Sequence, residues 1–156
     1  MSKLPYSNSK ADPTRAQGRI RKILLKFGVS SIGFNEDIEN TEVVVNFKYR
    51  DYPVVVPVNY GKLADLYIEE SPWTYRMRKT RSEYETRMHD TAYRASFSLL
   101  EDFIKASITT VEMGMFSFEE VFVSHFVTPD GVRLGEVFKH RLPDFINGQA
   151  ALGTGK

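Results

Sequence analysis

A long helical pattern from Ser82 to Met113 limits the possible folds of this chain more than any other feature. Two rows of apolar or small side chains recur in it at helical spacing. The first row comprises Met88, Ala92, Ala95, Leu99, Phe103, Ala106 and Thr110, and the second comprises Tyr93, Phe97, Leu100, Ile104, Ile108 and Val111. Together they form a face wider than a coiled-coil seam, so we expect the helix to bury it against a sheet or against a partner chain.

The start of the chain predicts a polar segment followed by a basic helix. Residues 1–11 are expected to form a flexible arm. Asp12 can cap a helix and Pro13 suits the first helical position, so a helix is expected from there to about Phe27. Gly28 is suited to the left-handed conformation that ends many helices.

Three strand-like runs follow and predict an antiparallel meander. They cover residues 30–34, 42–50 and 52–59, with a polar turn expected at 35–40. Because Pro53 and Pro57 lack a backbone N–H, the third strand is expected to lie at an edge of the sheet or to leave the sheet early. A further helical pattern, at residues 60–70, separates this sheet from the long helix.

Short helices are expected after the long one. Ser117 and Glu120 match a capping box, which begins a helix that extends to about residue 125. Residues 128–131 predict a turn, and residues 135–146 predict a last short helix that is interrupted near Pro143. The fold class is therefore expected to be α+β, with one domain at residues 12–147 and a flexible tail at residues 148–156.

Composition excludes several classes of site. The 156 residues include no cysteine, which rules out disulfides, thiolate metal sites and a cysteine nucleophile. No apolar run approaches the roughly 18 residues of a membrane span, and the polar N-terminus lacks the apolar centre of a signal peptide. We therefore expect a cytoplasmic protein that has no membrane partner.

No catalytic or metal-binding motif emerges, so the expected protein is not an enzyme and needs no cofactor. His89-Asp90 spells the dipeptide of HD-type phosphohydrolases, but no earlier histidine is present to complete a metal site. His125 lies in an apolar run and is expected to be a partly buried structural residue. Glu119 and Glu120 would point about 100° apart on a helix, so they cannot share one site.

Positive charge is concentrated in two segments, although the net charge is only +1. Residues 1–26 carry seven Lys or Arg against one acid, and residues 72–94 carry six against three. The candidate binding residues are Arg15, Arg19, Lys22 and Lys26, with Arg21 beside them, and Trp73, Tyr75, Arg76, Arg78, Lys79 and Arg81. Interleaved aromatic and cationic side chains can stack on bases and neutralise phosphates. The same residue types also suit a protein contact, or a connector whose rings pack on the sheet.

The order helix, three antiparallel strands, long helix is similar to that of double-stranded-RNA-binding domains. In that family, basic residues at the start of the last helix bind phosphates. The resemblance gives this role to Arg78, Lys79 and Arg81. The chain departs from the family in its extra helix at residues 60–70 and in the greater length of its final helix.

Residues 15–140 also resemble sequences of tailed-phage and prophage genomes. The distinctive segments are Ile108-Thr109-Thr110, Phe118-Glu119-Glu120-Val121-Phe122 and Val127-Thr128-Pro129-Asp130-Gly131. This resemblance implies a phage accessory protein in a bacterial host cell and transfers no functional residue. With the basic segments, it favours binding to nucleic acid or to a nucleic-acid-processing complex. The alternative is a protein-only inhibitor or adaptor that acts on a host defence or transcription protein. A homo-oligomer formed through the long helix is compatible with both.

Overall fold

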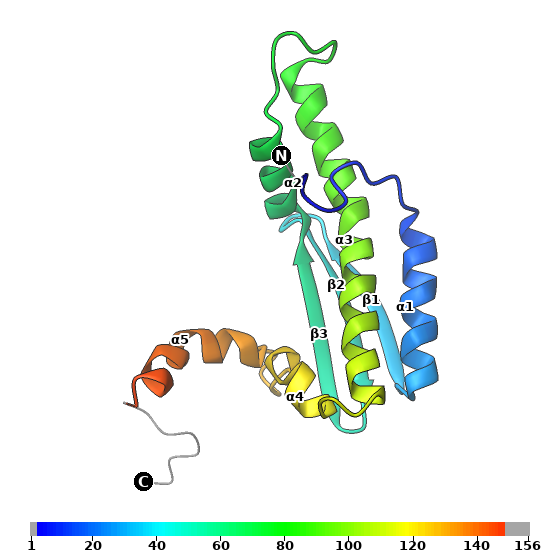
Figure 1. Cartoon of the computed structure of the whole chain (residues 1–156), viewed down its shortest axis with the longest axis vertical. Helices are drawn as coiled ribbons and strands as arrows, with labels where there is room; N and C mark the ends of the chain where they lie inside the picture. The colour runs from blue at the N-terminus through cyan, green and yellow to red at the C-terminus, as the bar shows by residue number, and fades with distance from the viewer. Residues whose placement is uncertain (1–2, 149–156) are drawn as a thin grey trace.

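The computed structural model describes residues 3–148 and confirms the expected α+β order of elements (Figure 1). The elements are α1 (Pro13–Phe27), β1 (Ser31–Asp37), β2 (Glu42–Tyr49), β3 (Tyr52–Asn59), α2 (Tyr60–Glu70), α3 (Arg81–Glu112), α4 (Phe118–Phe122), the 3₁₀ turn η1 (Val123–His125) and α5 (Leu134–Ile146). Residues 1–2 of the expected arm and residues 149–156 of the expected tail lie outside the described residues.

The predicted helix ends are confirmed where a local side chain determines them. Asp12 accepts a hydrogen bond from the Thr14 N–H at the start of α1, and Gly28 ends that helix at φ 105°. The capping box of Ser117 and Glu120 is present at the start of α4, with both reciprocal hydrogen bonds. These signals are readable in the sequence because each involves residues only a few positions apart.

The sheet is antiparallel, with the order β1-β2-β3. The turn predicted at residues 35–40 is wrong, because β1 continues to Asp37, which pairs with Glu42 of β2. The turn lies instead at residues 38–41. β2 alternates as predicted, with Val43 and Val45 buried on one side and Val44 half-buried on the other.

The main core lies between one face of the sheet and helices α1 and α3. Its buried residues include Ile20 and Leu24 of α1, Val45 of β2, and Phe97 and Ile104 of α3. Helix α4 closes the lower end of this core in Figure 1 with the rings of Phe118 and Phe122. The long helix therefore buries its apolar face mainly within its own chain.

Helix α2 covers only the N-terminal half of α3. Ala64 and Tyr67 of α2 form a second cluster with Ala92 and Ala95 of α3. Further along α3, Phe103 and Ala106 are exposed, so the expectation that the whole apolar face is buried is wrong there. Helix α2 lies beside the N-terminal half of α3 only (Figure 1), and Phe103 instead contacts the rings of Phe122 and His125, which leave it 36% exposed.

β3 lies at an edge of the sheet, as its prolines predict. Its outer side meets residues 126–127. The Pro53 carbonyl accepts a hydrogen bond of 3.0 Å from the Val127 N–H, and Val54 forms an isolated bridge with Phe126.

Helix α5 projects away from the rest of the molecule (Figure 1). It runs through Pro143, so the predicted interruption there is wrong. Among the described residues, no helix is both long enough and apolar enough to cross a membrane.

Candidate nucleic-acid interface

The four candidate cations of α1 form one exposed row. Arg15, Arg19, Lys22 and Lys26 recur at helical spacing and are all exposed. The Arg19 Nε lies 2.9 Å from the Glu101 carboxylate of α3, which places this row beside α3. Arg21 points elsewhere, with its guanidinium 5.5 Å from the centre of the Phe34 ring.

The second candidate group lies in the loop between α2 and α3. Its Trp73 is half-buried, and its indole N–H donates a 2.8 Å hydrogen bond to the Lys79 carbonyl. Trp73 therefore closes the loop on itself. Tyr75 is 81% exposed, and the Arg76 guanidinium lies 6.0 Å from the centre of its ring. Arg78 is exposed, and Arg81 pairs with Glu85 at the start of α3.

The two groups do not meet at one point. Arg94 of α3 lies beside the start of α1, because its guanidinium donates a 3.3 Å hydrogen bond to the Ala11 carbonyl. The helical rise between Arg81 and Arg94 is about 20 Å. Along the direction of α3, the loop cations therefore lie beyond the N-terminal end of the α1 row.

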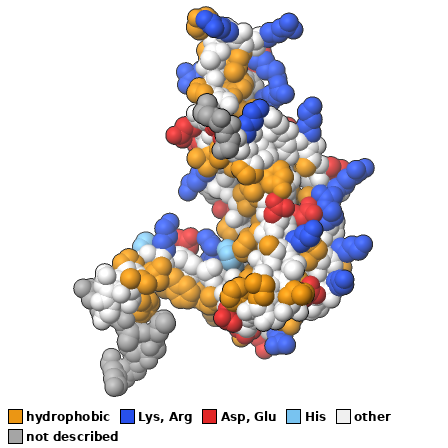
Figure 2. All heavy atoms as spheres, in the orientation of Figure 1, with side chains coloured by type: hydrophobic (Ala, Val, Ile, Leu, Met, Phe, Trp, Pro, Cys, Tyr) orange, Lys and Arg blue, Asp and Glu red, His pale blue; other side chains and the backbone are white. Residues whose placement is uncertain are grey.

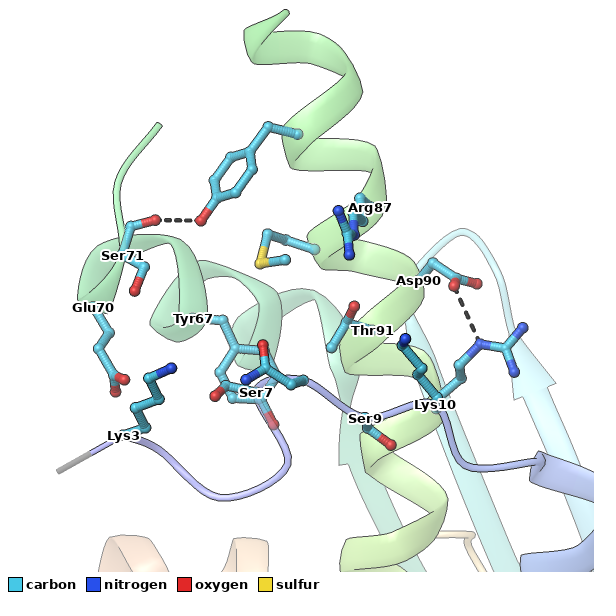
Figure 3. A pocket seen from close by; sticks show the side chains of 14 residues that line it. Lys3, Ser7, Ser9, Lys10, Tyr67, Glu70, Ser71, Arg87, Asp90 and Thr91 are labelled. Atoms are coloured by element: carbon cyan, nitrogen blue, oxygen red, sulfur yellow. Dashed lines mark hydrogen bonds and ion pairs between the residues drawn. The ribbon is translucent and has the colours of Figure 1, made fainter. Parts of the chain in front are cut away.

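A cavity of about 670 Å³ lies between the two groups (Figure 3). Its walls come from residues 3–10, the end of α2 and the first half of α3. The lining residues are Lys3, Ser7, Asn8, Ser9, Lys10, Tyr67, Glu70, Ser71, Tyr84, Arg87, Met88, Asp90, Thr91 and Arg94. This volume is within the usual range for sites that bind small molecules.

Hydrogen bonds hold the N-terminal segment against α2. The Glu70 carboxylate accepts from the Leu4 N–H at 2.9 Å, and the Tyr67 hydroxyl donates to the Pro5 carbonyl at 2.7 Å. Burial, and then the charge of Glu70, raise the pKa of Tyr67 above its ordinary value. The expected flexibility of residues 1–11 stays a prediction.

The cavity carries an excess of positive charge. Arg94 pairs with Asp90 at 3.2 Å, and Glu70 is engaged by the N-terminal backbone. Lys3, Lys10 and Arg87 also surround the cavity (Figure 3), and within residues 3–148 none of them has a carboxylate at ion-pair distance. These three positive charges repel one another. An anion bound between them would reduce that repulsion and would be attracted by all three side chains.

The binding residues predicted from the sequence did not include the cations that line the cavity, Lys3, Lys10, Arg87 and Arg94. Lys3 and Lys10 fall in the segment expected to be a flexible arm, so they were not assigned to a site. Arg87 and Arg94 are seven residues apart and share one side of α3, and this spacing is a readable signal. What the sequence does not reveal is that the N-terminal segment folds back beside them.

None of the three histidines lines the cavity. His125 is half-buried, as predicted, and its ring packs edge-on to Phe103 at 5.3 Å. Burial, and then the positive charge of Arg133, lower the pKa of His125. Within residues 3–148, no group of three His, Cys, Asp or Glu is arranged to hold a metal ion.

No protein-family model, curated protein or solved structure matches the chain. The phage resemblance therefore stays a prediction, and function has to be argued from the arrangement of the side chains.

Proposed function

We propose that this protein binds nucleic acid, without catalysis, through the side of the molecule formed by α1 and α3. The observation that carries the proposal is the position of Lys3, Lys10 and Arg87, which lie between the loop cations and the α1 row without ion-pair partners among the described residues. In Figure 2, Lys and Arg side chains gather at the loop end and along the α1 edge, with some carboxylates among them.

The length of this cationic surface suits a nucleic-acid backbone. From Arg81 to Arg94 the rise of α3 is about 20 Å, and from Arg15 to Lys26 the rise of α1 is about 16 Å. The sum is close to one turn of a double helix, which is about 34 Å. A row of separate cations over this length favours contacts to successive phosphates over recognition of one charged group.

The residue types favour contacts to the backbone over reading of bases. Exposed Lys and Arg bind phosphates without sequence preference, and such binding weakens as salt is added. Tyr75 is the most exposed ring of the loop, and it can stack on an unpaired base. The expected ligand is therefore DNA or RNA bound with little sequence specificity. The expected biological role is an accessory role in nucleic-acid processing in a phage-infected bacterium.

Fluorescence anisotropy with labelled single- and double-stranded DNA and RNA of equal length tests this proposal. Two double variants remove charge from the surface: Lys22→Glu with Lys26→Glu, and Lys10→Glu with Arg87→Glu. We expect both to bind more weakly, and the slope of log K against log salt to fall by about one for each phosphate contact that is lost.

Lys48→Glu is the control, because Lys48 is exposed and lies on the sheet face opposite α1 and α3. It should leave the affinity and the salt slope close to those of the wild type. An equal loss in this variant, binding that is insensitive to salt, or no binding at low salt would contradict the proposal. The protein-only alternative would be supported by two results together. The chain would show no affinity for nucleic acid, and one host protein would stay bound to it after nuclease treatment.

A further inference from the structure

Beyond Leu134, which packs against the main core, helix α5 presents an apolar side to solvent. None of its residues is buried; Leu142 is 51% exposed and Ile146 is 77% exposed. The apolar residues fall on one side of the helix at the usual spacing. They are Leu134, Val137, Phe138, Leu142, Phe145 and Ile146.

The direction of α5 is set by contacts at its first turn. The Leu134 N–H donates a 2.8 Å hydrogen bond to the Phe126 carbonyl, and Arg133 pairs with Glu136 at 3.0 Å. Gly135 packs so closely that an added Cβ would lie 2.8 Å from the Ser124 carbonyl oxygen. The apolar side beyond Leu134 is therefore held away from the chain's own core.

An apolar hollow of about 320 Å³ lies at the other end of α3 from the cavity, next to α4. It is lined by Ala106, Ser107, Thr110, Phe116, Glu120 and Val121. Met113 is 73% exposed and Phe116 is 49% exposed beside it. These side chains include the part of the α3 apolar face that α2 does not cover.

The two surfaces have complementary charges. Glu120 lines the hollow and has no ion-pair partner within residues 3–148. On α5, Lys139 and Arg141 likewise lack a carboxylate partner in that range. Arg141 falls within the apolar side of α5, with its guanidinium 5.4 Å from the centre of the Phe145 ring.

We propose that two copies of the chain pair by exchanging α5, so that each α5 lies in the α3–α4 hollow of the other copy. An apolar helix side with one guanidinium then meets an apolar hollow with one carboxylate, Glu120. In its own chain α5 points away from α3, whose residues line the hollow (Figure 1), so the second copy supplies the helix. The arrangement has two equal contacts related by two-fold symmetry.

Light scattering on size-exclusion fractions of the full chain tests the pairing. We expect the wild type to have twice the monomer mass. Leu142→Asp on α5 and Ala106→Glu in the hollow should each give the monomer mass. His140→Asp is the matched control, because it adds the same charge to the polar side of α5 and should leave the dimer intact.

Mixing the two disrupted variants tests which surfaces meet. A dimer of the Leu142→Asp chain with the Ala106→Glu chain retains one of its two contacts, so the mixture should recover part of the dimer. Disulfide formation gives a second measurement, which tolerates small losses of stability. Because the chain contains no cysteine, the double variant Leu142→Cys with Ala106→Cys has only these two thiols. Oxidation should link position 142 of one copy to position 106 of the other.

Three results would overturn the proposal. They are a wild type that stays monomeric as its concentration is raised, a dimer that withstands Ala106→Glu, and disulfides that join only two copies of position 142. None of these measurements uses nucleic acid, so this proposal and the proposed function can fail separately.

Discussion

At the scale of single residues, Tyr93 joins α3 to the sheet. Its hydroxyl donates a hydrogen bond to the Glu36 carboxylate of β1. Its ring packs edge-on to Tyr60 at 5.4 Å and to Phe97 at 5.3 Å. Burial, and then the hydrogen bond to Glu36, raise the pKa of Tyr93 to about 12 from the ordinary value of 10.0.

Tyr93→Phe should remove both this hydrogen bond and its pH dependence. Between pH 10 and about 12 the folded protein keeps a proton that the unfolded chain loses, so the wild type loses stability as the pH rises through this interval. The variant should show a smaller decline, because the raised pKa of Tyr67 contributes to the decline in both proteins, and at neutral pH it should be less stable by about 0.5–1.5 kcal/mol. Urea unfolding at a series of pH values measures both effects. The same decline in both proteins would show that Tyr93 is not its source.

At the scale of elements, the start of α5 depends on the absence of a side chain at position 135. A methyl group there would lie 2.8 Å from the Ser124 carbonyl oxygen, a backbone atom that cannot easily move away. In the middle of α1, by contrast, a Cβ at Gly18 would meet nothing within 4 Å. The two glycines therefore offer a matched pair of substitutions.

Gly135→Ala should destabilise the protein by about 1–3 kcal/mol, because the added group overpacks the contact with Ser124. Gly18→Ala should stabilise it by about 0.5–1 kcal/mol, because alanine loses less backbone entropy than glycine in a helix. Chemical denaturation of both variants measures the difference. Equal effects of the two substitutions would contradict the close packing at Gly135.

Local signals predicted most of the elements, and contacts distant in sequence account for most of the errors. The helix start at Asp12 and the edge position of β3 follow from residue types alone. The extra length of β1 depends on its pairing with β2, and the exposure of Phe103 depends on how far along α3 helix α2 reaches. In the candidate interface, the helical spacing of Arg15, Arg19, Lys22 and Lys26 predicted the row of cations on α1. The cavity was not predicted, because it forms only when residues 3–10 fold back onto α2 and α3.

At the scale of the whole molecule, the N-terminal segment ties together elements that are far apart in sequence. Leu4 is hydrogen-bonded to Glu70 of α2, and the Tyr6 hydroxyl donates to Asp102 of α3 at 2.5 Å. The segment also forms one wall of the cavity. Its loss should therefore loosen α2 more than the sheet.

Deletion of residues 1–10 should increase amide hydrogen exchange in α2 and in the first half of α3. Exchange in β2 and in the part of α3 beyond Asp102 should change little, because the main core there contains no residue of the segment. Mass spectrometry of peptides after exchange measures this pattern, and Lys62→Ala, an exposed change on α2, is the control. Unchanged protection of α2 would contradict the tethering role.

The edge at β3 has a consequence for how this protein behaves when it is concentrated. Because the Pro53 carbonyl points outward, Val55 and Pro57 also direct their backbone groups outward. Pro53 and Pro57 have no backbone N–H, and the Pro53 carbonyl already accepts a hydrogen bond from the Val127 N–H. A strand from another molecule therefore has few free backbone groups to pair with along this edge of β3. Growth of fibrils by strand addition is therefore blocked at this edge.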